Sequence, residues 1–146
     1  MKTKGVGGGN TITGLNFEKE RDILEILKKA KGYSVRNSII YYQGGEVARS
    51  YRKQGLYKLL TEKGVDWRKF ISKRLFPDEA LYVLVNNTLF IIEMKFQKVA
   101  GSVDEKLQTC DFKKKQYRKL MAPLNIEVEY IYILNDWFKN PSYKDT

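Results

Sequence analysis

Asp78, Glu93 and Lys95 are the residues of this 146-residue sequence whose types and spacing could do chemistry. Alternate side chains of a β-strand point to opposite faces, so in the segment IEMKFQ (residues 92–97) Glu93, Lys95 and Gln97 are expected to share one face. Two carboxylates can share a divalent cation, which neutralises charge on a phosphate and lowers the pKa of a bound water. The ammonium of Lys95 can orient that water or stabilise the charge that develops on the phosphate.

A β-hairpin is predicted to bring the two acids together. Residues 80–85 and 88–96 are rich in apolar and β-branched residues and flank Asn86-Asn87, a pattern typical of a hairpin with a two-residue turn. This turn pairs Val85 with Thr88, Ala80 with Glu93 and Asp78 with Lys95. Asp78 and Glu93 then become diagonal neighbours on one face, roughly 7–8 Å apart at the backbone, and the Met94 carbonyl could add an oxygen ligand. The alternative is a surface ion pair between Asp78 and Lys95, worth only ~0–1 kcal/mol.

The sequence contains no histidine and one cysteine, Cys110. This composition excludes histidine-based catalysis, zinc sites built from histidine or several cysteines, and a disulfide framework. A metal must therefore be held by carboxylates and carbonyls, which select hard ions such as Mg²⁺ or Mn²⁺. No apolar run approaches the ~20 residues of a membrane span, and no signal peptide is evident. We expect a cytoplasmic protein without a membrane partner.

The charge of the chain favours a polyanionic partner. It carries 27 Lys and Arg against 17 Asp and Glu, a formal net charge of +10, together with ten Tyr and seven Phe. We expect this partner to be DNA. Candidate phosphate contacts fall in the basic stretch 46–74 and on a later helix: Arg49, Arg52, Lys53, Lys106, Lys113, Lys114, Lys115 and Arg118. The alternative for both groups is a solvated polar face. Ser102 is expected to cap a helix and could also contact phosphate.

The elements that must position these residues follow from hydrophobic spacing. Residues 1–14 are glycine-rich and are expected to form a flexible arm, and residues 15–146 a single domain. The predicted elements are a helix over 15–31, a strand over 35–42, two short helices within 46–74, the hairpin, a helix from Ser102 to Met121 and a strand over 126–134. This order, helix-strand-helix-hairpin-helix-strand, predicts an α/β fold with a mixed sheet flanked by helices.

Pro77-Asp78, fourteen intervening residues and Glu93-Met94-Lys95 together resemble the signature of the PD-(D/E)XK nuclease superfamily. The segment EMKFQ is similar to the Glu-x-Lys-x-Gln variant of some type II restriction endonucleases, and GSVDEKL (residues 101–107) is similar to a segment of restriction-type and phage-associated members. The resemblance spans residues 15–134. It implies a restriction-endonuclease-like core in which Asp78 and Glu93 bind Mg²⁺, Lys95 assists the attacking water and Gln97 supports the site.

Many members also carry a glutamate on the first helix, and GLNFE (residues 14–18) places Glu18 there. The alternative for Glu18 is a solvated residue stabilised by the helix dipole. We therefore expect a Mg²⁺-dependent DNA endonuclease, of the type II restriction kind and acting as a homodimer. The alternatives are a nuclease for branched DNA, such as a Holliday-junction resolvase, and a non-catalytic nucleic-acid-binding domain, which needs neither metal nor carboxylate pair.

Overall fold

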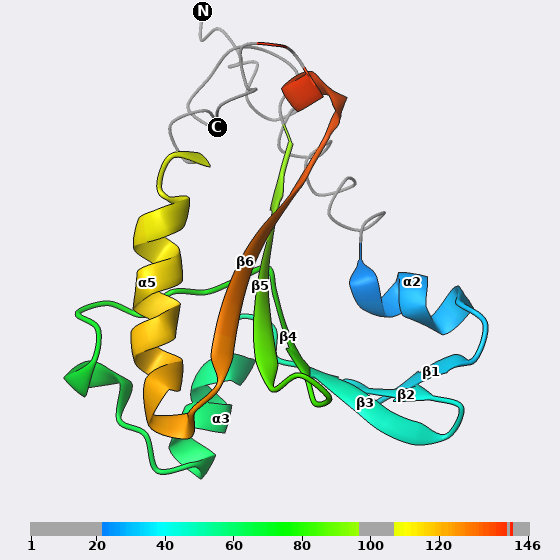
Figure 1. Ribbon diagram of the computed structural model, residues 1–146, viewed down its shortest axis with the longest axis horizontal. Helices are drawn as coiled ribbons and strands as arrows, with labels where there is room; N and C mark the ends of the chain where they lie inside the picture. Colours follow the sequence, from blue (N-terminus) through cyan, green and yellow to red (C-terminus); the bar gives the residue numbers. More distant parts are fainter. Residues whose placement is uncertain (1–21, 97–106, 140, 142–146) are drawn as a thin grey trace, which may run out of the picture.

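A computed structural model describes residues 22–96, 107–139 and 141 (Figure 1). Its centre is a six-stranded mixed sheet in sequential order. The strands are β1 (Tyr33–Arg36), β2 (Ile39–Tyr42), β3 (Gly45–Ser50), β4 (Glu79–Val83), β5 (Thr88–Lys95) and β6 (Glu127–Leu134). Neighbouring strands are antiparallel except β5 and β6, which are parallel. The helices are α2 (Ile23–Lys29), α3 (Gly55–Glu62) and α5 (Cys110–Met121), with short 3₁₀ turns η1 (Trp67–Lys69), η2 (Ala122–Leu124) and η3 (Asp136–Lys139).

Helices α3 and α5 pack on one face of the sheet and form the core with it, whereas α2 lies on the other side (Figure 1). The core joins Leu60 of α3 and Leu120 of α5 to Ala80, Leu89 and Ile91 of the hairpin, all fully buried. Because parallel neighbours need a crossover, the chain returns through α5 between β5 and β6. The fold is thus the predicted mixed sheet flanked by helices.

The amino-terminal elements differ from the prediction in three places. Helix α2 begins at Ile23, because Asp22 has an extended backbone and its carboxylate accepts hydrogen bonds from the N–H groups of Leu24 and Glu25. The helix predicted over 15–31 is therefore interrupted at Asp22, and its residues 15–21 lie outside the described residues. The single strand predicted over 35–42 is wrong. Asn37 and Ser38 adopt positive φ values of 51° and 65°, which make a tight turn and divide the segment into β1 and β2. Strand β3 was not predicted.

The β4–β5 hairpin is present, but its turn is longer than predicted. Val83 pairs with Thr88, so residues 84–87 form a four-residue connection. The side chain of Asn87 accepts a hydrogen bond from the Tyr82 hydroxyl at 2.6 Å and donates one to the Asn125 carbonyl at 2.7 Å, which stabilises this longer turn.

The predicted pairs Val85–Thr88, Ala80–Glu93 and Asp78–Lys95 are therefore wrong by two residues. Because the side-chain period of a strand is two, an even shift leaves every side chain on its predicted face.

Candidate metal and catalytic site

Asp78 and Glu93 lie side by side at the open end of the hairpin. Glu79 pairs with Ile92, so one further step of the register sets Asp78 opposite Glu93. The Oδ2 atom of Asp78 accepts a hydrogen bond of 2.8 Å from the backbone N–H of Met94, which fixes this approach. Directly opposed side chains share a face. Both carboxylates therefore project from the face that α3 and α5 cover.

The carbonyl of Met94 points to the β4 side of β5, where Asp78 lies. In an antiparallel ladder a residue directs its N–H and its C=O to the same neighbour, and the N–H of Met94 meets Asp78. Extending the register two residues beyond the Glu79–Ile92 pair would place Pro77 opposite Met94. Since proline has no N–H, it cannot donate a ladder hydrogen bond to this carbonyl. Two carboxylates and a carbonyl oxygen thus lie at the same end of the β4–β5 hairpin.

This donor set fits Mg²⁺ or Mn²⁺, which take oxygen ligands. Within the described ranges, no three Asp, Glu, Cys or His side chains come together as a metal cage. Mg²⁺ does not need one, because it usually keeps several waters and is bound through one or two protein carboxylates. Asp78, Glu93 and the Met94 carbonyl are the residues that would hold it.

Lys95 contacts Glu93 on the same face, as the alternation in β5 predicts. Its ammonium lies 3.2 Å from the Oε2 atom of Glu93, and the two side chains are only 18% and 9% exposed. The predicted alternative partner, Asp78, instead bonds the Met94 N–H. A positive charge therefore stands next to the candidate metal ligands in a site that is largely shielded from solvent.

Two tyrosines border the carboxylates, the buried Tyr117 and the half-buried Tyr130, and neither was predicted to belong to the site. Burial raises the pKa of the Tyr117 hydroxyl, and the negative charges of Glu93 and Asp78 raise it further. Burial and, to a smaller extent, the negative charge of Glu93 likewise raise the pKa of the Tyr130 hydroxyl. Both phenols stay neutral at ordinary pH. The parallel pairing of β5 with β6, which sets Glu93 beside Tyr132 and two residues from Tyr130, explains this proximity, and local sequence patterns do not reveal it.

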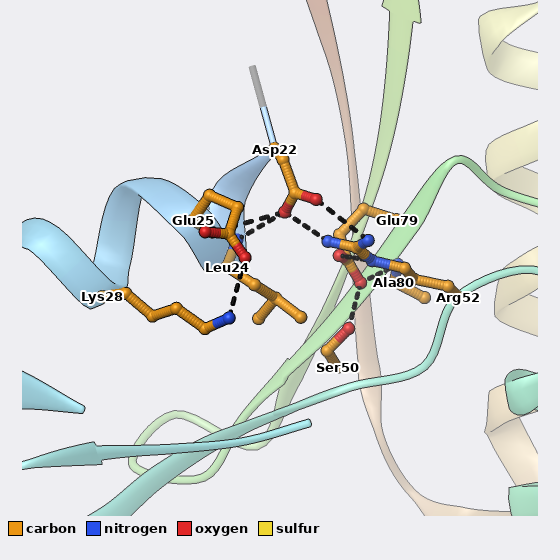
Figure 2. Close-up of polar contacts among 8 residues, drawn as sticks. All are labelled: Asp22, Leu24, Glu25, Lys28, Ser50, Arg52, Glu79 and Ala80. Atoms are coloured by element: carbon orange, nitrogen blue, oxygen red, sulfur yellow. Dashed lines mark hydrogen bonds and ion pairs between the residues drawn. The ribbon is translucent and has the colours of Figure 1, made fainter. Parts of the chain in front are cut away.

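The opposite face of β4 holds a buried polar network, shown in Figure 2. Glu79 is 1% exposed and accepts hydrogen bonds from the Ser50 hydroxyl at 2.6 Å, the Arg52 Nε at 2.8 Å and the N–H of Ala80 at 3.0 Å. Arg52 also donates to Asp22, the cap of α2, and this hydrogen bond lowers the pKa of the Asp22 carboxyl. The network ties α2 and the end of β3 to the residue that follows Asp78.

The residues predicted to contact DNA are dispersed. Arg52 is bound in the network of Figure 2, whereas Arg49 pairs with Glu46 and lies on the α3 face, opposite Tyr82. Lys53 is exposed, and its backbone N–H donates to the Pro77 carbonyl at 3.2 Å. Arg49 and Arg52 therefore project to different faces, and the structure does not bring them together as one surface.

The predicted contacts on α5 divide by exposure. Lys114 bonds Glu129 of β6 at 2.8 Å and Lys113 is half-buried, whereas Lys115 and Arg118 are exposed. Four predicted site residues lie outside the described residues: Glu18, Gln97, Ser102 and Lys106.

Comparison with known proteins gives no family assignment. No family model matches the sequence, and a search of curated proteins finds no match. Among the described residues, no helix has both the length and the apolar character required to cross a lipid bilayer.

Proposed function

We propose that this protein is a Mg²⁺-dependent nuclease that hydrolyses phosphodiester bonds in DNA. One observation carries the proposal: at the open end of the β4–β5 hairpin, Asp78 bonds the Met94 backbone, Glu93 lies on the same face, and Lys95 contacts Glu93. The arrangement agrees with the role that the resemblance to PD-(D/E)XK nucleases gives these residues. The element order also agrees with the core that the resemblance implies: an antiparallel hairpin, a crossover helix and a parallel strand follow one another in β4, β5, α5 and β6.

Each residue has a role that follows from its position. Asp78, Glu93 and the Met94 carbonyl would hold the cation. When bound, Mg²⁺ would offset the charge of the scissile phosphate and lower the pKa of a coordinated water. Lys95 would orient the attacking water and stabilise charge on the phosphate oxygens. Its ammonium is fixed by Glu93, which pre-organises the site.

The charge of +10 supports a nucleic-acid substrate. Two substrate classes fit the proposal: linear duplex DNA with a short recognition sequence, as for a type II restriction endonuclease, and branched DNA. A homodimer would supply a second site for the second strand.

The experiment is a cleavage assay on plasmid, linear duplex and four-way-junction DNA, with millimolar Mg²⁺ or with EDTA. The wild type is expected to cut only with Mg²⁺. Asp78→Asn and Glu93→Gln should abolish cutting, and Glu127→Gln, which removes an exposed carboxylate of β6, should cut normally. Cleavage that survives in both site variants would refute the proposal. Binding of DNA by the wild type without any cleavage would instead identify the non-catalytic alternative.

A further inference from the structure

An aromatic–arginine cluster lies in the chain segment that leads into Asp78. It consists of Tyr57, Trp67, Arg74 and Phe76. The guanidinium carbon of Arg74 lies 5.8, 5.7 and 5.5 Å from the ring centres of Tyr57, Trp67 and Phe76, respectively. The Tyr57 ring meets both other rings edge-on, at 5.9 and 5.8 Å. Phe76 nevertheless keeps 47% of its surface exposed, so part of an aromatic face remains open.

The cluster is held rigidly. The Tyr57 hydroxyl donates a hydrogen bond to the Leu75 carbonyl at 2.8 Å and accepts one from the Leu75 N–H at 2.6 Å. These two bonds fix the backbone immediately before Phe76. A preformed aromatic surface binds a flat ligand without first having to be ordered.

The cluster is also close to the candidate catalytic residues. Phe76 precedes Asp78 by two residues, at most about 7 Å of extended chain. Tyr57 and Tyr117 belong to the same core, and the Tyr117 pKa responds to Glu93, Tyr57 and Asp78 together. A nucleotide next to a phosphate at Asp78 would therefore reach Phe76.

The surroundings of the cluster offer rings, hydrogen-bonding groups and a predominantly positive charge. A cavity of about 400 Å³ adjoins it, lined by Tyr57, Trp67 and Arg74, by the polar side chains of Gln54, Lys58 and Thr61, and by one acidic residue, Glu62. Aromatic rings and a guanidinium plane suit the faces of a base, amide and hydroxyl groups suit its edge, and the cations suit the phosphate. The guanidinium of Arg68, which pairs with Asp66 at 3.5 Å, lies 5.2 Å from the Trp67 ring centre.

We propose that the aromatic–arginine cluster binds an unpaired nucleobase next to the phosphate that is cut, so that this site prefers DNA with single-stranded nucleotides, such as a gap or a flap, over continuous duplex. Bases within a duplex are stacked and paired and cannot present a face to Phe76. The part of the inference that concerns cleavage rests on the proposed nuclease function; the binding of the base does not.

The test measures binding by fluorescence anisotropy in EDTA, with labelled DNA of one sequence as a single strand, a duplex and a gapped duplex. The wild type should bind the single-stranded and gapped forms more tightly than the duplex. Phe76→Ala should weaken binding of these two forms by about tenfold, the effect of losing one base–aromatic stack, and should leave duplex binding unchanged. Phe76→Trp should restore it.

Two further variants keep the result interpretable. Arg74→Gln changes an exposed side chain without opening the core and should also weaken single-strand binding. Tyr42→Ala removes a ring of similar exposure, 42%, from β2 and should bind as the wild type does. Equal affinity of the wild type for all three DNA forms, or equal losses for Phe76→Ala and Tyr42→Ala, would overturn the inference.

The EDTA measurement separates this inference from the proposed function. Tight, Phe76-dependent binding of single-stranded DNA together with no cleavage in Mg²⁺ would support the base-binding cluster and refute the nuclease. Mg²⁺-dependent cleavage that is equally fast on duplex and gapped DNA and unchanged in Phe76→Ala would support the nuclease and refute the cluster.

Discussion

Replacing Arg52 with alanine tests the buried network behind the candidate site. Arg52 makes one hydrogen bond to Glu79, whose carboxylate is almost fully buried, and pairs with Asp22 near the surface. Truncation leaves the Glu79 carboxylate with two donors instead of three, the Ser50 hydroxyl and the Ala80 N–H.

The size of the stability loss follows from the two contacts of the guanidinium, one with Glu79 and one with Asp22. A hydrogen bond to a charged group is worth about 1.5–3 kcal/mol, and an exposed ion pair about 0–1 kcal/mol. The Arg52 side chain is 41% exposed, so water replaces part of what is lost and the loss stays below the ~3–5 kcal/mol of a fully buried pair. We expect Arg52→Ala to lower the free energy of unfolding by about 2–3 kcal/mol, or the melting temperature by roughly 5–10 °C.

Urea unfolding, monitored by tryptophan fluorescence, measures this change in the free energy of unfolding. The matched control is Arg68→Ala, which removes a guanidinium that is 73% exposed and should cost less than about 0.5 kcal/mol. A double-mutant cycle with Glu79→Gln should give a coupling of more than about 1 kcal/mol. Equal stability of Arg52→Ala and Arg68→Ala, or a coupling near zero, would refute the reasoning.

Three further predictions concern single side chains. Arg52 lowers the pKa of Asp22 below its ordinary value of 3.8, so this pair stabilises the folded state above about pH 4 and is lost as the pH falls through the lowered pKa. Asp22→Asn, which can still cap α2, should therefore lower the free energy of unfolding by up to about 1 kcal/mol at neutral pH and leave it unchanged in strong acid. A difference between the variant and the wild type in urea unfolding that does not depend on pH would contradict this. Tyr57→Phe leaves the backbone N–H and C=O of Leu75 without their partner and should cost about 1–3 kcal/mol in the same assay, and an unchanged midpoint would show that water replaces the hydroxyl. Lys95→Met should slow Mg²⁺-dependent DNA cleavage about a hundredfold or more while leaving metal binding intact, and an unchanged single-turnover rate would remove Lys95 from the mechanism.

The part of the site that lies within one hairpin could be predicted from the sequence. The alternation in β5 sets Glu93 and Lys95 on one face, and strand periodicity sets Asp78 on that face even though the predicted register is wrong by two residues. The longer turn could not be predicted, because the contact that stabilises it joins Asn87 to Asn125, 38 residues away.

The network around Glu79 escaped prediction for the same reason. Its partners Ser50 and Arg52 are 29 and 27 residues away, and no local pattern distinguishes a buried glutamate from an exposed one. The start of α2, in contrast, has a local signal. Asp22 followed three residues later by Glu25 is typical of a helix start, but the hydrophobic periodicity favoured a longer helix. Long-range contacts, rather than local propensity, therefore hold Glu79, the residue next to Asp78, in place.

The central claim is that Asp78 and Glu93 hold one metal ion. Its most direct test is to measure Mn²⁺ binding to the purified protein, with the free ion detected by electron paramagnetic resonance. The wild type should bind one Mn²⁺ that Mg²⁺ displaces, and Asp78→Asn and Glu93→Gln should each weaken this binding by at least about tenfold, whereas Glu127→Gln should not. Undiminished binding in both site variants would show that the two carboxylates do not hold one ion.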